Sequence, residues 1–381
     1  MNLLATAERT PSPEDRTAAR ALCARIRTLP PTYQYRELRQ APADNHWALC
    51  EALCVESQRL CAEDPVQAAT VAELALKVVD RVVGEEAWRA KLRGFAWAHV
   101  GNALRVQGDL QAAERAFLSA GQFWEAGKEA QNGLLEEGLL LAFNALLRWR
   151  QRRFEEAEKL LARAFAAASS VTFRVQVRIS MAKLCKETGD LERAVEILQE
   201  ASATAIPEDD GRLFLCLQHN LVDGLSKLDR FPEAEALLPA AIDLSRKCGG
   251  EKDFLRLLWI EGRVAAGLGK TNEAVAALRR VRGEFAARHM SYDTALVSLE
   301  LAALYAEQGQ VQDVKTLARH MVPILRARDV HPEVLKALTL FRQSAEREEV
   351  TAKFIQEVLS YLRKARHEPG LRFEGRAGLD L

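Results

Sequence analysis

The chain has 381 residues, of which 48% are hydrophobic and 28% charged, a balance that argues for a folded chain and against intrinsic disorder. Lysine plus arginine and aspartate plus glutamate number 53 each, so net charge provides no overall attraction to nucleic acid or to an anionic membrane. No apolar run approaches the roughly 20 residues of a membrane-spanning helix, and Glu8 and Arg9 interrupt the position of a signal peptide's apolar segment. We therefore expect a cytoplasmic protein, with which seven scattered cysteines in largely apolar surroundings are compatible.

The N-terminal residues 1–43 differ from the rest of the chain. Ser12 is a good helix cap and Pro13 is tolerated in a first turn, so a helix is predicted from here to about Leu29. Pro30 and Pro31 end it, and a short helix is expected over 33–40. We interpret 1–43 as a helical capping segment, with the remnant of a separate domain as the alternative.

From residue 44 onward a short turn recurs and divides the sequence into repeats. Its first members are spaced by 37 to 44 residues, and by 40 in the last three intervals: Gly108, Arg152, Gly189, Asp229, Gly269 and Gly309. Five residues after each stands Ala or Val, nine residues after stands Phe, Leu or Ala, and twelve residues after stands Ala, Val or Met. Offsets of four and seven lie on one stripe of a helix, so a small residue permits close approach and a large one fills the space beyond.

These repeats predict an array of antiparallel helix pairs over 44–330. The expected pairs are 44–62 with 65–82, 87–107 with 110–125, 133–150 with 154–168, 172–188 with 191–204, 211–228 with 232–247, 252–268 with 271–288, and 292–308 with 311–328. A last pair, 332–345 with 348–366, is expected to cap the array. A tail follows it, because Pro369 and Gly370 end a helix, and the C-terminal capping region therefore comprises 331–381.

The clearest copy resembles the tetratricopeptide repeat. It carries Trp97, Val100, Gly101 and Leu104, then Gly108, then Ala113, Phe117 and Ala120, close to the pattern Trp-x2-Leu-Gly-x2-Tyr…Ala-x3-Phe. The resemblance implies an all-α fold, a right-handed superhelical α-solenoid, of the kind found in the repeat region of bacterial helix-turn-helix regulators. The period near 40 exceeds the usual ~34, which predicts helices or linkers longer by one to two turns.

Two groups of residues resemble sites of known chemistry. Gly267–Thr271 ends like a phosphate-binding loop, but Val264 stands where the first glycine of that motif belongs, and the segment falls on a predicted turn between helices. His46, Cys50, Cys54 and Cys61 share one helix stripe, yet they extend over about 22 Å of helix axis, too far for one tetrahedral metal site. We interpret both as structural and predict no metal or cofactor.

No arrangement of nucleophile and base is present, since the seven histidines fall in different repeats and neither Gly-x-Ser-x-Gly nor His-Glu-x-x-His occurs. We therefore predict that the chain is not an enzyme. The densest basic run, Arg148–Arg153, is compatible with contact to nucleic acid or to an acidic partner. It also spans a helix C-terminus, where arginine is electrostatically favoured, and a solvated turn is the interpretation that we prefer.

In proteins that this chain resembles, the first helix of each pair lines a concave groove. The positions three, six, ten and thirteen residues before each turn are then expected to face that groove. The candidate partner-binding residues at these positions are Asn102, Arg105, Trp149, Lys183, Lys186, His219, Asp223, Arg256, Trp259 and Arg263. Five are lysine or arginine, and the two tryptophans supply the rigid contact area typical of binding hot spots.

These residues predict a scaffold or adaptor that binds a protein or peptide with acidic residues or a free C-terminal carboxylate. Asn102, Arg105 and Lys183 are suited to a carboxylate clamp like that of some relatives. An alternative is a sensory or regulatory module, peptide-responsive or associated with nucleic acid, although a nucleic-acid partner is disfavoured. A second alternative is that these charges only solvate an exposed helix face.

Overall fold

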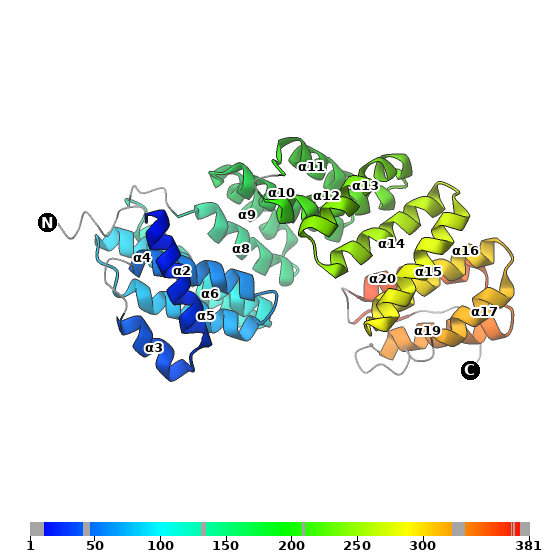
Figure 1. Cartoon of the computed structure of the whole chain (residues 1–381), viewed down its shortest axis with the longest axis horizontal. Coiled ribbons are helices and arrows are strands. Elements are labelled where there is room, and N and C mark those ends of the chain that lie inside the picture. The colour runs from blue at the N-terminus through cyan, green and yellow to red at the C-terminus, as the bar shows by residue number, and fades with distance from the viewer. Residues whose placement is uncertain are drawn as a thin grey trace. The chain divides into compact units, whose positions relative to one another are not determined.

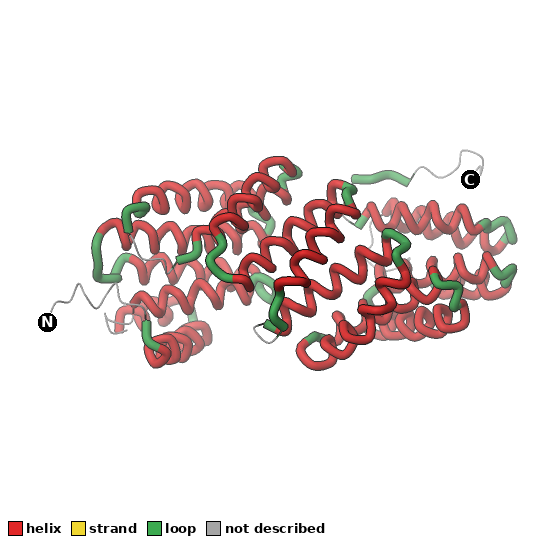
Figure 2. Tube along the Cα trace, turned by 90° about the horizontal axis from the view of Figure 1, so that it is seen from above, coloured by secondary structure: helices red, strands yellow, loops and turns green. Residues whose placement is uncertain are grey.

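The computed structural model describes residues 11–40, 46–130, 135–207, 210–321, 332–366, 368 and 370–373. All regular secondary structure in these ranges is α-helical, with no strand, as Figure 2 shows. The predicted all-α fold is therefore confirmed. The chain forms two compact units, Met1–Ala205 and Ile206–Leu381, which we describe separately. The predicted domain boundaries after residues 43 and 330 remain predictions.

The N-terminal unit is a succession of antiparallel helices (Figure 1). Its helices are α2 (Pro13–Thr28), α3 (Pro31–Gln40), α4 (His46–Leu60), α5 (Pro65–Val79), α6 (Glu86–Gln107), α7 (Leu110–Ala126), α8 (Glu137–Arg150), α9 (Phe154–Ala167), α10 (Val171–Thr188) and α11 (Leu191–Thr204). We call α4, α6, α8 and α10 first helices and their partners α5, α7, α9 and α11 second helices. Each first helix packs on its second helix, and α6 also contacts the neighbouring first helices α4 and α8.

The C-terminal unit continues the same pairing. Its helices are α12 (Gly211–Lys227), α13 (Phe231–Cys248), α14 (Glu251–Gly267), α15 (Thr271–Ala287), α16 (Ser291–Glu307), α17 (Val311–His320), α19 (Pro332–Glu346) and α20 (Ala352–Ala365). Here α12, α14 and α16 are the first helices. None of the described helices is long and apolar enough to cross a membrane.

All six predicted turns use left-handed backbone at their first residue. Four are glycines, which adopt this conformation without a steric penalty, but Arg152 and Asp229 also take it, with φ of 63° and 56°. The repeat therefore fixes the turn geometry even where the sequence lacks glycine. Lys270, in the segment that resembles a phosphate-binding loop, is part of such a turn and forms an ion pair with Glu235 at 2.5 Å.

The predicted packing stripe is confirmed in both units. The small residues at the fifth position after each turn are almost fully buried: Ala113, Ala157, Ala194, Ala234, Ala274 and Val314. The larger residues four positions later are also buried, among them Phe117, Leu161 and Leu198. Close approach of the paired helices follows, because an alanine side chain at this position leaves room for the partner helix.

Gly101→Leu should lower the free energy of unfolding by about 1–3 kcal/mol, because the new side chain overpacks the α6–α7 contact. A Cβ at Gly101 would lie 3.0 Å from the Phe117 ring, tighter than ordinary van der Waals contact. Gly121→Leu is the matched control, since Gly121 is an exposed helix position with nothing within 4 Å of its added Cβ. Urea unfolding of both variants measures the difference, and equal stability would contradict the assigned helix pairing.

The predicted N-terminal helix is present as α2, with the cap at the expected residue. Ser12 Oγ accepts from Asp15 N at 3.1 Å, and Ser12 N donates to Asp15 Oδ2 at 2.8 Å. This reciprocal pair is a capping box, which satisfies two otherwise unpaired backbone donors. Helix α2 packs on α4 and on α3.

Several predicted helix ends differ from the structure, most of them by one to three residues, and α20 begins at Ala352 rather than at 348. Helix α8 begins at Glu137 rather than at 133, because Glu136 is extended and its carboxylate accepts from Ser169 N at 2.8 Å. Helix α17 ends at His320 rather than at 328, and most of the remaining predicted residues lie outside the described part. At the C-terminus α20 packs on the first helix α16 as well as on α19, while α19 also contacts α17. These four helices close the C-terminal unit.

Candidate binding surface

The ten predicted binding residues all lie on first helices, but they divide evenly between the two units. Asn102, Arg105, Trp149, Lys183 and Lys186 belong to the N-terminal unit. His219, Asp223, Arg256, Trp259 and Arg263 belong to the C-terminal unit. Each set is therefore considered as a surface of its own unit.

Arg105 is a half-buried cation whose hydrogen-bond acceptor is neutral. Its Nη2 and Nε donate to Asn102 Oδ1 at 2.8 and 3.3 Å, and no carboxylate of the described residues pairs with it. Asn102 is itself buried, and its Nδ2 donates to Cys61 Sγ at 3.5 Å. Burial, with a smaller effect from the nearby positive charge of Arg150, lowers the pKa of Arg105 from 12.5 to about 10. This position therefore favours an anion.

The other three predicted residues of the N-terminal unit are half-buried on α8 and α10. Trp149 packs at the edge of a hydrophobic cluster that includes Leu161 and Leu184. Lys183 forms no ion pair with a described residue, and no hydrogen bond links it to Asn102 or Arg105. The structure thus brings Asn102 and Arg105 together, while the clamp's predicted third member stays separate from them.

Two of the four arginines in the basic run Arg148–Arg153 form ion pairs with acidic residues of α7 and α9. Arg148 forms an ion pair with Glu114 of α7 at 2.5 Å, and Arg153 forms ion pairs with Glu156 at 2.6 Å and Glu114 at 3.5 Å. Hydrogen bonds from Arg148 and Gln151 lower the pKa of Glu114, so it remains ionised at neutral pH. The guanidinium of Arg152 lies 4.9 Å from the Phe154 ring centre. This arrangement favours the solvated-turn interpretation.

In the C-terminal unit the predicted residues form an internal network on α12 and α14. Asp223 accepts from Lys227 at 2.9 Å and from Arg263 at 3.1 Å. The Arg263 guanidinium also lies 5.6 Å from the ring centre of Trp259. Arg263 is therefore neutralised within the chain, whereas Arg256 is exposed and has no ion-pair partner among the described residues. His219 is half-buried on α12.

Trp259 extends this network to the C-terminal helix. Its Nε1 donates to Glu300 Oε2 at 2.5 Å, and its ring meets Phe285 edge-on at 5.8 Å. Glu300 is buried on α16 and also accepts from Arg363 of α20 at 2.6 Å. The indole is thus fixed by a buried carboxylate that sequence reasoning missed.

The two sequence groups that resemble sites of known chemistry lie on an inter-helix turn and on a packed helix. Gly267 ends α14, Gly269 takes the left-handed turn with φ of 74°, and Thr271 begins α15, so no strand precedes this segment. Cys50 and Cys54 are buried. No group of three or more potential metal ligands occurs within the described ranges, which exclude the His46 side chain.

The described helices have the fold of a tetratricopeptide-like α-solenoid, in which antiparallel helix pairs follow one another within each unit. No protein-family model matches the sequence, and no curated protein is similar to it in sequence. Among solved structures, the apo form of RapI is similar with a TM-score of 0.53 and 14% identity, over 72% of this chain and 98% of that chain.

Two further solved structures have the same fold. A Rap protein complexed with Competence and Sporulation Factor has a TM-score of 0.51 and 12% identity, over 84% of this chain and 99% of that chain. Aspartyl phosphate phosphatase F from Bacillus subtilis has a TM-score of 0.50 and 13% identity, over 100% of this chain and 97% of that chain.

Proposed function

We propose that this chain is a non-enzymatic scaffold that binds a protein or peptide on its first helices. We place an anionic group of the partner, an acidic side chain or a C-terminal carboxylate, on Arg105. The observation that carries the proposal is the half-buried Arg105 guanidinium, which has Asn102 as a neutral acceptor and no carboxylate partner among the described residues.

The physical reason lies in desolvation. Burying a guanidinium without a counter-charge costs free energy, and the lowered pKa of Arg105 expresses that cost. A ligand carboxylate supplies the missing counter-charge, and its geometry matches the two parallel donors of a guanidinium. In the free protein the Arg105 guanidinium has already lost part of its hydration. A ligand carboxylate therefore gains more binding free energy at Arg105 than at an exposed arginine.

Other features of the N-terminal unit suit an extended partner. Trp149 offers a half-buried aromatic surface on α8, which follows α6 in the row of first helices. Lys183 of α10 is free of ion pairs with described residues and is available to a second acidic group. One solved structure with this fold is a Rap protein in complex with a factor, which supports a binding role for such arrays. We therefore propose that Arg105, Trp149 and Lys183 contact the same partner.

The alternative, a sensory or regulatory module, uses the same surface and differs in the consequence of binding. Association with nucleic acid is less favoured, because Glu114 and Glu156 neutralise Arg148 and Arg153 in the basic run. A gel shift on generic DNA over a salt series distinguishes a peptide-binding scaffold from a module associated with nucleic acid. Salt-sensitive binding through 148–153 would favour association with nucleic acid.

Arg105→Ala should weaken binding of carboxylate-bearing peptides by at least tenfold, because a charge-assisted hydrogen bond contributes about 1.5–3 kcal/mol. The measurement is fluorescence polarisation against labelled peptides that end in a free carboxylate, with C-terminally amidated copies for comparison. Arg115→Ala, an exposed arginine on the second helix α7, is the matched control. Equal affinity in the Arg105 and Arg115 variants, or for the acid and amide peptides, would contradict the assignment of Arg105.

A further inference from the structure

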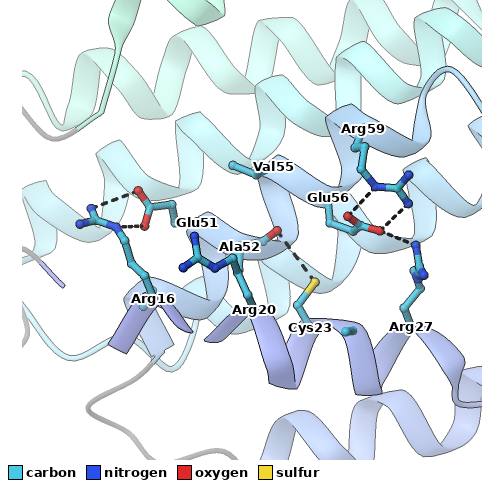
Figure 3. A pocket seen from close by; sticks show the side chains of 11 residues that line it. Arg16, Arg20, Cys23, Arg27, Glu51, Ala52, Val55, Glu56 and Arg59 are labelled. Atoms are coloured by element: carbon cyan, nitrogen blue, oxygen red, sulfur yellow. Dashed lines mark hydrogen bonds and ion pairs between the residues drawn. The ribbon is translucent and has the colours of Figure 1, made fainter. Parts of the chain in front are cut away.

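The N-terminal helix α2 and the first helix α4 enclose a groove of about 600 Å³ (Figure 3). This volume falls within the roughly 300–1,000 Å³ typical of ligand sites. It lies apart from the α6 position assigned above, because α2 and α4 alone supply its lining. The lining residues are Arg16, Arg20, Cys23, Ala24, Arg27, Ala48, Glu51, Ala52, Val55, Glu56 and Arg59.

Ion pairs between α2 and α4 occur toward the two ends of the groove. Arg16 Nε lies 2.9 Å from Glu51 Oε2, and its Nη2 donates to Oε1 at 3.3 Å. Toward the other end, Glu56 of α4 pairs with Arg27 of α2 at 2.6 Å and with Arg59 of its own helix at 2.9 Å. The hydrogen bond from Arg59 lowers the pKa of Glu56, so this carboxylate remains ionised. Both lining glutamates are therefore neutralised by arginines already in place.

Between these two ends Arg20 has no counter-charge among the described residues. Figure 3 places it on α2 between Arg16 and Cys23, facing Ala52 of α4. It is exposed, its Nη2 donates to Thr17 Oγ1 at 3.3 Å, and it forms no ion pair with a described residue. The lining holds four arginines against two glutamates, and Arg59 also pairs with Glu63 outside the lining at 2.7 Å, so within the described chain the one unbalanced positive charge of the lining is that of Arg20. The excess positive charge calls for an anionic occupant.

The groove also has an apolar side. Val55 of α4 is 62% exposed, and Ala24 and Ala52 are also part of the lining. An exposed arginine alone holds a carboxylate with only about 0–1 kcal/mol, so stable binding needs apolar burial at the same time. Arg16 and Arg27 are 11 residues apart on α2, about 16 Å, which equals about five extended residues.

We propose that this groove binds a short acidic peptide segment, with one carboxylate on Arg20 and an apolar side chain against Val55. A polyphosphate backbone is disfavoured as the occupant, because Glu51 and Glu56 would repel a second and third negative charge. The segment requires no free terminus, because the groove offers one positive charge that no described residue pairs with, that of Arg20, and the side chain of one Glu or Asp satisfies it.

The proposal is tested with labelled five-residue peptides that are acetylated and amidated, with Glu at the centre and Leu, Val or Phe beside it. Binding is followed by fluorescence polarisation in the Arg105→Ala background, so that failure of the α6 assignment cannot be mistaken for failure of this one. We expect at least one peptide to bind, and Arg20→Ala to weaken it at least fivefold. Val55→Asp should weaken it at least tenfold.

Two controls make the result specific. A peptide with Gln in place of Glu should lose as much affinity as the Arg20→Ala variant does, and the two changes together should cost no more than either alone. Arg25→Ala, on the same helix but paired with Glu37 of α3, should leave binding unchanged. The proposal is overturned if no peptide of the set binds, or if binding persists unchanged in Arg20→Ala or with the Gln peptide.

Discussion

Replacing Arg363 and Arg366 together with alanine should lower the free energy of unfolding by about 3–5 kcal/mol, because removing one partner leaves a buried charge uncompensated. Arg363 neutralises Glu300 at 2.6 Å and Arg366 neutralises Asp293 at 2.8 Å. Both carboxylates are on α16, with side chains only 7% and 8% exposed. Urea unfolding followed by circular dichroism measures the loss, and amide hydrogen exchange of α16 and α20 locates it.

Lys364→Ala is the matched control, since Lys364 is exposed on the same helix α20. Adding Glu300→Gln to the Arg363→Ala variant should restore part of the lost stability, because a neutral amide is less costly to bury than an unpaired carboxylate. If the double arginine variant unfolds at the same urea concentration as Lys364→Ala, the ion pairs do not hold α20 on α16.

These ion pairs give the C-terminal helix a role that its amphipathic pattern alone does not reveal. Ile355 and Leu359 bury its apolar side, while Arg363 and Arg366 neutralise acidic groups of α16. Glu300 also accepts from Trp259 of α14, so α20 is connected through one carboxylate to the preceding repeat. Loss of α20 would therefore affect both the C-terminal end and the orientation of Trp259.

Most helix ends could be predicted from the sequence, because one turn geometry recurs. The predicted second helices beginning at 110, 154, 191, 271 and 311 begin at those residues in the structure. The physical cause is the left-handed residue that precedes each of them, which ends the first helix at a fixed place. Glycine at Gly108 and Gly189 signals this conformation, whereas the turns at Arg152 and Asp229 were predicted from the recurrence of the pattern every 37 to 44 residues.

The partners of the surface charges were not predicted, although the repeat interval contains a signal for them. Asp223 and Arg263 are 40 residues apart, one repeat, and so occupy the same position on successive first helices. Lys183 has Leu146 at the corresponding position 37 residues earlier, which explains its lack of an ion pair within its unit. Comparing charges one repeat apart would have separated the neutralised Arg263 from the free Lys183.

The α2–α4 groove was beyond reach of sequence reasoning for a different reason. The repeat pattern begins after α2, so no period relates Arg16 to Glu51 or Arg27 to Glu56. Their pairing depends on how α2 docks, which the capping box at Ser12 does not determine. Unlike Arg16 and Arg27, Arg20 pairs with no acidic side chain of the described residues, and this difference depends on three-dimensional packing.

The stability of the N-terminal unit should fall in acid because of His99, and His99→Leu should reduce that fall. His99 is buried on α6, with its ring 4.8 Å from Phe95 and 5.3 Å from Phe143. Neither ring nitrogen has a hydrogen-bond partner among the described residues. Burial lowers the pKa of His99 from 6.5 to about 3, because the charged imidazolium is excluded from this apolar site.

The direction of this pH effect on stability follows from proton linkage. Between pH 6.5 and pH 3 the unfolded chain binds a proton at His99 that the folded chain does not, so acid favours unfolding. At about 1.4 kcal/mol per pH unit below 6.5, the contribution lost at pH 4 is about 3 kcal/mol. Above pH 6.5 His99 is neutral in both the folded and the unfolded chain, so this loss of stability is absent. Urea unfolding of wild type and His99→Leu at pH 7 and pH 4 measures the difference.

At pH 7 His99→Leu should be at least as stable as wild type, because leucine is apolar and leaves no unsatisfied ring nitrogen. Between pH 7 and pH 4 it should lose about 3 kcal/mol less than wild type, and His320→Leu, at an exposed position, provides the comparison. An equal loss in wild type and His99→Leu would mean that the ring is protonated in the folded chain, and that the contact between α6 and α8 opens to water in acid.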